Sequence, residues 1–362
     1  MPRVAIVVLL VLAPTAALLA DWRLFRGNPQ QTGVADVALP EKLDILWKVQ
    51  LKDGVEGTAA IAGDTVYVGA IGEFLYALDL RTGAEKWKYK AGPITSPASY
   101  HDGAVYIGDE DGIFHCVDAS SGKKRWSFET NGEISSGANF SDDKIIFTGK
   151  DSMLYCLDSK GKLVWKFKTE GPVYGSATVA GGMTFVAGCD SHLHIVDLKT
   201  GKEAAKISLE GQAGSTPAAA GDRLFVGTMS NQFLAIDLKK KDIAWIYEPA
   251  RAQGFYSSPA VTDKLILVGC RDRALHALDR VKGTKVWTFL TRGHVDSSPV
   301  VAGKNVLFGS KDGHLYVVDI EKGAEVQKLA LGRSIIASPA VSNGRVVIGA
   351  TDGLLYCLGK KE

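Results

Sequence analysis

Few side chains in this sequence stand at a spacing that could support chemistry. His192 and His194 are two residues apart, so on a strand they would share one face, where imidazoles can bind a metal ion. His294 and Asp296 have the same spacing and could form a polar pair. No GxSxG, HExxH or P-loop sequence occurs, and no two of the five cysteines lie closer than 33 positions. The cysteine spacing excludes a CxxC metal or redox site.

The histidines recur at one place in a repeated phrase, which favours a structural role. His115, His194 and His276 hold the second position of phrases such as Phe114–Asp118, and tyrosine holds it in other copies. His194 is therefore interpreted as an aromatic substitute, and only His192 is left near a loop. We predict no metal site and no catalytic residue from this sequence.

The phrase repeats eight times and defines the organisation of the chain. Seven copies end in aspartate at intervals of 39 to 42 residues, and the eighth, Leu354–Gly359, ends in glycine. Each period contains four short segments with alternating apolar positions, typical of half-buried strands, separated by turn pairs such as Asp111-Gly112. Four strands in about 40 residues are what a β-propeller blade requires.

Proline and tryptophan orient the strands within each blade. Pro97, Pro259 and their equivalents recur in the first segment, and proline lacks the N–H that an interior strand needs, so this segment should be the inner edge. The fourth segment centres on tryptophan and should be the outer edge. One such segment, Leu46–Val49, precedes all the others, while the last blade lacks its own. We therefore predict an all-β, eight-bladed propeller of four-stranded antiparallel blades over residues 43–362, closed by the N-terminal strand completing the C-terminal blade.

The first residues differ from the repeats. Residues 1–20 combine one basic residue, an apolar run and small residues, the order of a secretory signal peptide, with an uncleaved membrane anchor as the alternative. Residues 21–42 form an N-terminal extension. No cysteine lies near the cleavage region, so we predict a periplasmic or secreted protein without a lipid anchor or a later transmembrane segment.

Composition limits the partners. Lys plus Arg number 42 and Asp plus Glu number 40, a net charge of +2 that does not indicate a nucleic-acid partner. Hydrophobic residues at 46% and charged residues at 23% are typical of a globular protein. The five cysteines are interpreted as small core residues and not as a disulfide framework. We expect a monomer.

The stretch Ala77–Trp87, with its Asp-x-x-Thr-Gly turn, resembles the tryptophan-docking motif of pyrroloquinoline quinone (PQQ)-like propellers. That family includes quinoprotein alcohol dehydrogenases and the outer-membrane assembly factor BamB. Asp21–Asn28, followed by Thr32-Gly33, resembles the leader that precedes such propellers in exported bacterial proteins. Turn and packing chemistry assigns the recurring residues to structural blade docking. They are Trp47, Trp87, Trp126, Trp165, Trp245 and Trp287, with Asp79, Asp118, Asp158, Asp197, Asp237, Asp279 and Asp319. Ala205 and Gln327 replace the tryptophan in two blades, which we expect to pack less well at the rim.

The resemblance implies two different functions. A quinoprotein dehydrogenase would need an aromatic floor for PQQ, an acidic Ca²⁺ site and usually an adjacent cysteine pair, and this sequence has no Cys-Cys pair and no spare propeller tryptophan. We therefore predict no PQQ, Ca²⁺ or other cofactor, and an exported non-enzymatic scaffold that binds protein partners of the cell envelope, with BamB-like support of outer-membrane protein assembly. A PQQ-dependent or related oxidoreductase is the alternative.

Recognition is expected on the loops that vary between repeats. The longest interval, 42 residues, contains an insertion that we expect to expose Phe255 and Tyr256 beside Arg251, the residue types favoured in interfaces. The other candidate partner-binding residues are Arg271, Arg273, Arg292, His294 and Asp296.

Overall fold

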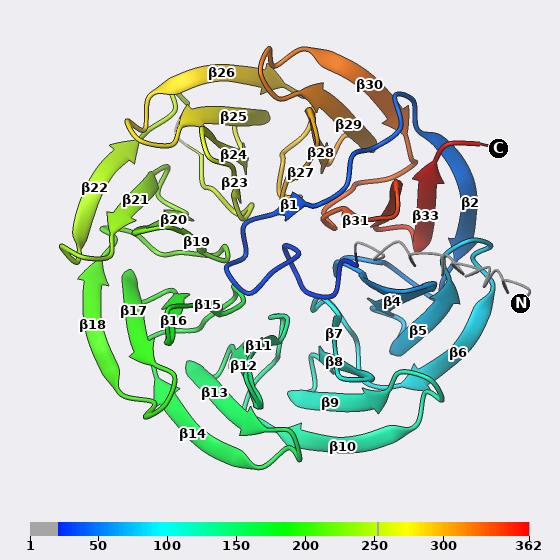
Figure 1. The fold of residues 1–362 in the computed structure, drawn as a ribbon, viewed down its shortest axis with the longest axis horizontal. Helices are drawn as coiled ribbons and strands as arrows, with labels where there is room; N and C mark the ends of the chain where they lie inside the picture. The colour runs from blue at the N-terminus through cyan, green and yellow to red at the C-terminus, as the bar shows by residue number, and fades with distance from the viewer. Residues whose placement is uncertain (1–20, 252, 362) are drawn as a thin grey trace, which may run out of the picture.

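The eight repeats form eight four-stranded antiparallel sheets arranged as the blades of a closed wheel (Figure 1). The structure, a computed structural model, describes residues 21–251 and 253–361, so the predicted signal segment lies outside the described residues. Within those ranges no helix is long and apolar enough to cross a membrane. The predicted fold is confirmed.

Each of the first seven blades runs outward in chain order. The strands are β3 (Ala60–Ala62), β4 (Thr65–Ala70), β5 (Phe74–Asp79) and β6 (Glu85–Lys90) in blade 1; β7 (Ser99–His101), β8 (Ala104–Gly108), β9 (Ile113–Asp118) and β10 (Lys124–Glu129) in blade 2; β11 (Asn139–Ser141), β12 (Lys144–Gly149), β13 (Met153–Asp158) and β14 (Leu163–Lys168) in blade 3; and β15 (Thr178–Ala180), β16 (Met183–Ala187), β17 (His192–Asp197) and β18 (Glu203–Ser208) in blade 4. They continue with β19 (Ala218–Ala220), β20 (Arg223–Gly227), β21 (Phe233–Asp237) and β22 (Asp242–Tyr247) in blade 5; β23 (Ala260–Val261), β24 (Leu265–Cys270), β25 (Ala274–Asp279) and β26 (Lys285–Leu290) in blade 6; and β27 (Val300–Ala302), β28 (Asn305–Gly309), β29 (His314–Asp319) and β30 (Glu325–Ala330) in blade 7.

The two ends of the chain close the wheel in blade 8. Its inner strands are β31 (Ala340–Ser342), β32 (Arg345–Gly349) and β33 (Leu354–Gly359), and its outer strand is β2 (Asp44–Gln50), which pairs antiparallel with β33. Trp47 lies opposite Cys357 in this pair, and Figure 1 shows blue β2 beside red β33. The predicted closure is confirmed, and it leaves blade 8 with the same four strands as the others.

Burial explains the strand order. The middle strands of each blade are buried on both faces and are almost wholly apolar, whereas the outermost strands alternate exposed and half-buried residues. Pro259 comes directly before innermost strand β23 and Pro97 two residues before β7, where a missing N–H costs no ladder hydrogen bond. The core therefore lies between neighbouring sheets, as where Tyr67 and Leu75 of blade 1 pack with Val105 of blade 2.

Each tryptophan joins its blade to the next one. The Trp47 Nε1 donates to the carbonyl of Leu80 at 3.0 Å, and its ring lies against Gly83, where a Cβ atom would come within 2.8 Å. Gly83 also has φ +76°, in the region that favours glycine. The indole N–H donates in the same way from Trp87, Trp126, Trp165 and Trp287. Trp245 packs on Gly283 but its Nε1 has no hydrogen-bond partner.

The aspartates organise the turns that receive these rings. Asp79 accepts hydrogen bonds from the main-chain N–H groups of Arg81 and Thr82, and the hydrogen bonds from Thr82 hold the pKa of Asp79 below its usual value. The same carboxylate–turn bonds are made by Asp118, Asp158, Asp197, Asp237, Asp279 and Asp319.

The two blades without tryptophan use other contacts at the rim. In blade 4 Ala205 replaces tryptophan, and the turn of blade 5 that would receive the ring carries Lys241 in place of glycine. In blade 7 the Gln327 amide bonds both main-chain groups of Leu43, with Nε2 to carbonyl O at 2.7 Å and N–H to Oε1 at 2.9 Å. The amide thus makes two hydrogen bonds to the closing segment where an indole makes one, and the expectation that blades 4 and 7 pack less well at the rim stays a prediction.

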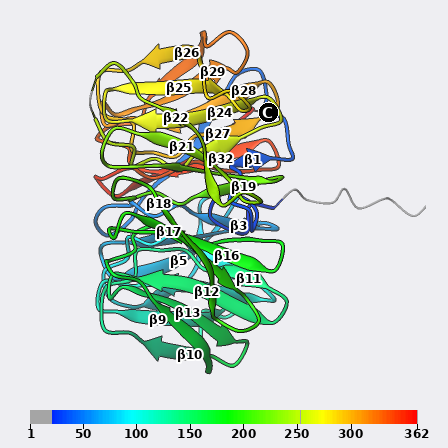
Figure 2. The ribbon, with the colours of Figure 1, turned by 90° about the vertical axis from the view of Figure 1, so that its left-hand side faces the viewer.

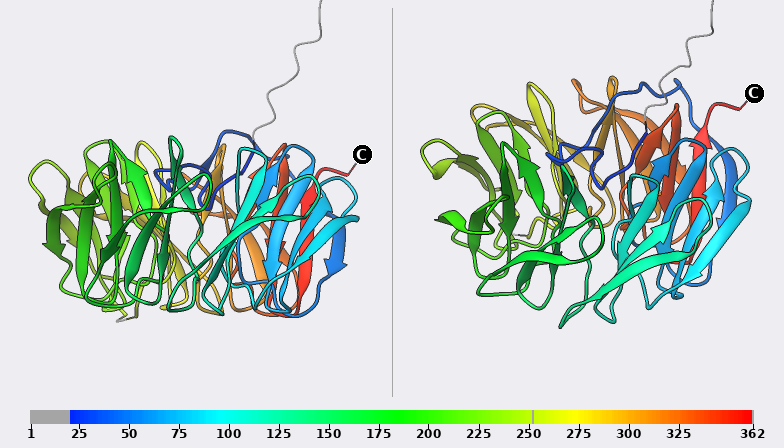
Figure 3. Two further views of the ribbon diagram at one scale, coloured as in Figure 1. Left: turned by 90° about the horizontal axis from the view of Figure 1, so that it is seen from below. Right: turned by 60° about the horizontal axis from the view of Figure 1, so that its bottom comes forward.

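The N-terminal extension winds around the channel mouth on one face of the wheel (Figures 1 and 3). Its carbonyls accept hydrogen bonds of 2.7–2.9 Å from main-chain N–H groups of six innermost strands, and β1 (Val34–Ala35) pairs parallel with β27. The pairs, in acceptor–donor order, are Trp22–Ile61, Arg23–Tyr100, Pro29–Val179, Gln30–Ala219, Thr32–Val261 and Gly33–Val301. The sequence did not predict this role, in which the extension is part of the wheel.

Arg26 anchors the extension in the channel. Its side chain is fully buried and donates to the carbonyls of Ser298 at 3.2 Å, Pro259 at 3.0 Å and Pro299. Burial lowers the pKa of Arg26 to about 9. Gly33 packs directly on the guanidinium, so an added Cβ there would collide with it.

We expect Gly33→Ala to destabilise the protein more than Gly63→Ala. Both glycines have positive φ, +66° and +59°, so each alanine pays about 1 kcal/mol of backbone strain. An added Cβ would collide with Arg26 at Gly33, and displacing that side chain should add about 1–3 kcal/mol, whereas nothing lies within 4 Å of a Cβ at Gly63. Urea unfolding measures the free energy of unfolding of both variants. Equal decreases in the two variants would contradict the expected displacement of Arg26.

Candidate functional site

The wheel has two unlike faces. Figure 2 views it edge-on and places β1 and the C-terminus on the same face. The opposite face carries the loops that join the second strand to the third, and the fourth strand to the next blade, because alternate connections of an antiparallel sheet share one edge. We call it the loop face. It carries the predicted partner-binding residues.

The channel opens on the loop face as a polar hollow of about 170 Å³. Most of its lining is hydroxyl groups, and these also join neighbouring blades: the Ser258 N–H donates to Ser298 Oγ at 2.9 Å, and the Ser298 N–H donates to Ser338 Oγ at 2.9 Å. Phe25 of the extension also lines it. The other lining groups used below are Glu56, Tyr174, Tyr256 and Asp296.

Four side chains form a charged and aromatic cluster beside this mouth. Asp296 accepts two hydrogen bonds from Arg271, from Nε at 2.9 Å and from Nη2 at 3.0 Å, and forms an ion pair with Lys311 Nζ at 2.7 Å. The Arg271 guanidinium carbon lies 3.4 Å from the centre of the Tyr256 ring, a cation–π contact. The residues come from loops of blades 6 and 7, so the cluster bridges two blades. We call it the Arg271 cluster.

The electrostatics of the mouth differ between its two sides. Burial alone would raise the pKa of Asp296, but hydrogen bonds from Arg271 and Lys311 outweigh it and the pKa lies below the usual value. Burial and then the neighbouring Glu110 raise the pKa of Glu56. Asp296 is thus held as an ion-paired carboxylate, suited to fixing Arg271 in place, and Glu56 marks an acidic side of the mouth.

The structure brings together only part of the predicted set. Arg271, Tyr256 and Asp296 are in contact, but Asp296 pairs with Arg271 and Lys311, so the proposed pair with His294 is wrong. The remaining predicted residues Arg251, Arg273 and Arg292 are exposed on the loop face.

Phe255 was expected to be exposed, and it is fully buried. It packs on Phe233 and His276, and its Cβ lies against Gly227, the contact that Ile94 makes with Gly69 in blade 1. Phe255 is therefore the core residue of its repeat. The recurrence of an apolar residue three or four positions before each proline could have shown this.

Sequence reasoning also missed Lys311. It follows β28 at the same distance from the strand glycine as Arg271 follows from the glycine of β24, Gly309 and Gly269 respectively. Aligning these two loops would have placed both cations on neighbouring blades, with Asp296 in the loop between them.

The closed ring of eight blades, with tryptophan docking on the Asp-turn of the next blade, defines a PQQ-like propeller. A family model described as outer membrane protein assembly factor BamB matches residues 41–135, 110–204 and 189–362. The chain belongs to this family. A search of curated proteins found no match.

Solved structures share the fold at low identity. BamB from Moraxella catarrhalis is 20% identical with a TM-score of 0.76, over 89% of this chain and 98% of that one. Quinohemoprotein alcohol dehydrogenase from Comamonas testosteroni is 14% identical with a TM-score of 0.81, over 95% and 81% of the two chains. A europium-containing methanol dehydrogenase is 14% identical with a TM-score of 0.77, over 94% and 98%. The neighbours therefore include an outer-membrane assembly factor as well as alcohol and methanol dehydrogenases.

The residues at the channel mouth do not fit a tricyclic quinone with Ca²⁺. The hollow of about 170 Å³ is smaller than the roughly 300–1,000 Å³ usual for pockets of small-molecule ligands. Asp296, one of its two carboxylates, is already bound by Arg271 and Lys311. Ca²⁺ would need six to eight oxygen ligands, and the mouth would have to surrender this ion pair to supply them.

We expect Asp296→Asn to lower the free energy of unfolding by about 1–3 kcal/mol at pH 7, because it leaves Arg271 without its carboxylate. A carboxyl whose folded pKa is depressed stabilises the fold above its unfolded pKa of about 3.9 and loses that contribution as the pH falls through the folded value. The difference between wild type and variant should therefore shrink below about pH 4.

Urea unfolding at pH 7 and pH 3 measures this difference. Asp263→Asn is the matched control, because Asp263 is fully exposed and should change stability by less than about 0.5 kcal/mol. A pH-independent loss in Asp296→Asn would show that the ion pair is not its cause.

Proposed function

We propose that this chain is an exported, non-enzymatic propeller that binds protein partners in the cell envelope and supports outer-membrane protein assembly as BamB does. The family match and the BamB neighbour support this role. The observation that carries it is the Arg271 cluster, a fixed arginine–tyrosine site at the centre of the loop face.

The cluster has the physical properties of an interface anchor. Arginine and tyrosine are enriched among residues whose truncation costs most in binding. Arg271 is held by Asp296 and by the Tyr256 ring before any partner arrives, so binding need not order it. Exposed Arg273 and Arg292 extend the cationic surface on the same blades. The partner segment that fits this side carries carboxylates and an apolar or aromatic group.

The acidic side of the channel mouth would set the orientation in which a partner docks. Glu110 lies close enough to Glu56 to raise the pKa of Glu56, and both residues lie in loops of the loop face. A partner with charges of both signs would thus dock in one orientation, because the reversed pose places like charges together. We expect this arrangement of charges to increase the specificity of partner binding more than its affinity.

A PQQ-dependent oxidoreductase is the second candidate, favoured by the similarity of the fold to quinoprotein dehydrogenases. The small, hydroxyl-lined mouth argues against it, because a planar cofactor would have to displace the hydroxyl belt that joins the blades.

Deleting the gene should lower the amount of β-barrel proteins in the outer membrane of the source organism. A gene copy carrying Arg273→Glu and Arg292→Glu should restore those levels poorly, because two exposed cations of the proposed site become anions. Lys124→Glu combined with Lys166→Glu, exposed on outer strands β10 and β14, is the charge-matched control and should restore them fully. Quantitative mass spectrometry of membrane fractions measures the outcome.

Two results would contradict the proposal. One is full restoration by the Arg273→Glu, Arg292→Glu protein at wild-type abundance. The other is alcohol-dependent dye reduction by purified protein mixed with PQQ and Ca²⁺, which would support the oxidoreductase instead.

A further inference from the structure

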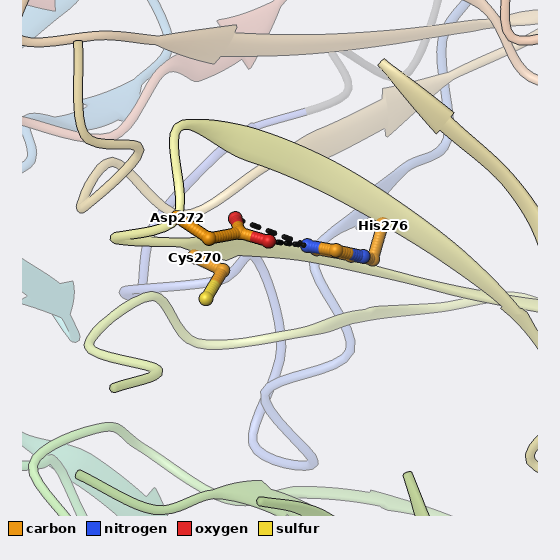
Figure 4. A group of neighbouring side chains, drawn as sticks. All are labelled: Cys270, Asp272 and His276. Atoms are coloured by element: carbon orange, nitrogen blue, oxygen red, sulfur yellow. Dashed lines mark hydrogen bonds and ion pairs between the residues drawn. The ribbon is translucent and has the colours of Figure 1, made fainter. Parts of the chain in front are cut away.

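A second cluster with chemical potential lies in blade 6, beneath the inserted loop. Cys270 ends β24, and Asp272 and His276 come from the turn and strand that follow. One ligand atom from each of the three lies within 4.8 Å of the other two, and the side chains are buried. Figure 4 shows the Asp272 carboxylate facing the His276 ring, with the Cys270 sulfur beside them. No part of the Arg271 cluster is needed to form it.

Two of the three residues belong to a pattern of the repeat. Asp190 bonds His194 in blade 4, with Oδ2 to Nε2 at 2.8 Å, and Asp151 and Asp312 accept from the tyrosines four residues later. The carboxylate–aromatic pair is thus a scaffold device that ties the hairpin together. By itself it does not indicate a ligand.

The thiol is what distinguishes blade 6. Cys270 lies opposite Ala274 at the end of its hairpin, where Ala70 in blade 1 and Gly149 in blade 3 hold the equivalent register. In blade 4 the corresponding residue, directly after β16, is Gly188. Blades 2, 5 and 7 hold Asp109, Thr228 and Ser310 at this position, so it accepts polar side chains as well as small ones. Blade 6 is the described blade in which a sulfur at this position meets an Asp–His pair.

The surroundings complete a metal-like environment. Tyr247 Oη lies 3.0 Å from His276 Nδ1, so this nitrogen has a partner and Nε2 is left toward Asp272, the arrangement seen for histidines that bind metals. The carbonyl oxygen of Gln253, in the inserted loop, lies 3.5 Å from Cys270 Sγ. This oxygen is the candidate fourth ligand.

We propose that Cys270, Asp272 and His276 form a binding site for a divalent transition-metal ion, with Zn²⁺ as the ion best matched to a thiolate, a carboxylate and an imidazole. Four ligands at about 2.0–2.3 Å around one tetrahedral ion lie roughly 3.3–3.8 Å apart. The Asp272 to His276 contact of 3.0 Å and the Sγ to Gln253 oxygen distance of 3.5 Å are close to that spacing. The Cys270 sulfur lies within 4.8 Å of the Asp272 and His276 ligand atoms, so it must move closer to them to bind the same ion.

Charge also balances at the site. Binding replaces the hydrogen bond that His276 Nε2–H donates to Asp272. The imidazole stays neutral by carrying its proton on Nδ1, where Tyr247 Oη accepts it, and the thiol proton of Cys270 is released to solvent. The thiolate and the carboxylate then carry two negative charges against the two positive charges of the ion, so a neutral assembly is buried. The ion would fasten the inserted loop to the hairpin beneath it. This inference does not depend on the proposed function.

Zinc titration of the tag-free full chain by calorimetry tests the site. We expect one equivalent to bind with micromolar or tighter affinity, and binding to weaken at least about 100-fold in Cys270→Ala and in His276→Tyr. Both changes introduce residues that other blades hold at these positions, so folding should be retained, which circular dichroism checks. Co²⁺ in place of Zn²⁺ should give a thiolate charge-transfer band that Cys270→Ala abolishes.

His194→Tyr and Cys116→Ala are the matched controls, since they remove the Asp–His partner of blade 4 and another buried thiol. Both should bind as wild type does. The proposal is overturned if wild type binds no stoichiometric Zn²⁺, or if Cys270→Ala and His276→Tyr bind it as tightly as wild type. Loss of binding in His194→Tyr alone would also overturn it, because the ion would then lie in blade 4.

Discussion

A ring of sheets has inner edges whose main-chain N–H groups no strand of the same blade can pair, and the whole molecule depends on satisfying them. Six innermost strands donate to carbonyls of residues 22–33, one after another around the channel. Arg26 lies at the centre of this winding and uses its guanidinium to bond carbonyls of blades 6 and 7. The extension is therefore a part of the sheet system, and a propeller without it would expose unpaired backbone groups along its axis.

At the outer rim the constraint is different. Neighbouring sheets diverge there, and side chains must fill the wedge-shaped gap between them. A tryptophan ring fills each wedge only where the next turn offers a glycine with positive φ, as Gly83 does for Trp47. Blade 4 shows that the tryptophan and the glycine depend on each other. Ala205 replaces the tryptophan, and Lys241 replaces the glycine of the turn that would receive its ring. Gln327 shows a third solution, in which an amide bonds the closing segment directly.

The sequence was sufficient to predict the structural features that recur in every blade. It was not sufficient to predict the features that occur once in the chain. Blade number, strand order and closure followed from periodicity, proline and the displaced Trp47 segment, since each has a local physical cause. The path of residues 21–42 did not, because the main-chain N–H groups that it binds lie on six different blades. Phe255 was misplaced because the inserted loop hid its repeat register, and Lys311 was missed because an ion pair across two blades leaves no local pattern.

The Cys270, Asp272 and His276 group is a further feature that occurs once, and each of its residues alone fits the repeat pattern. His276 and Asp272 are each explained by the scaffold, and Cys270 is explained as a small core residue, so each alone supports no ligand. Their convergence within 4.8 Å is a property of three positions at once, and it arises in the blade whose loop is longest. In a repeat protein the informative position is therefore the one where independent exceptions meet, because a scaffold role can explain each exception but not their coincidence.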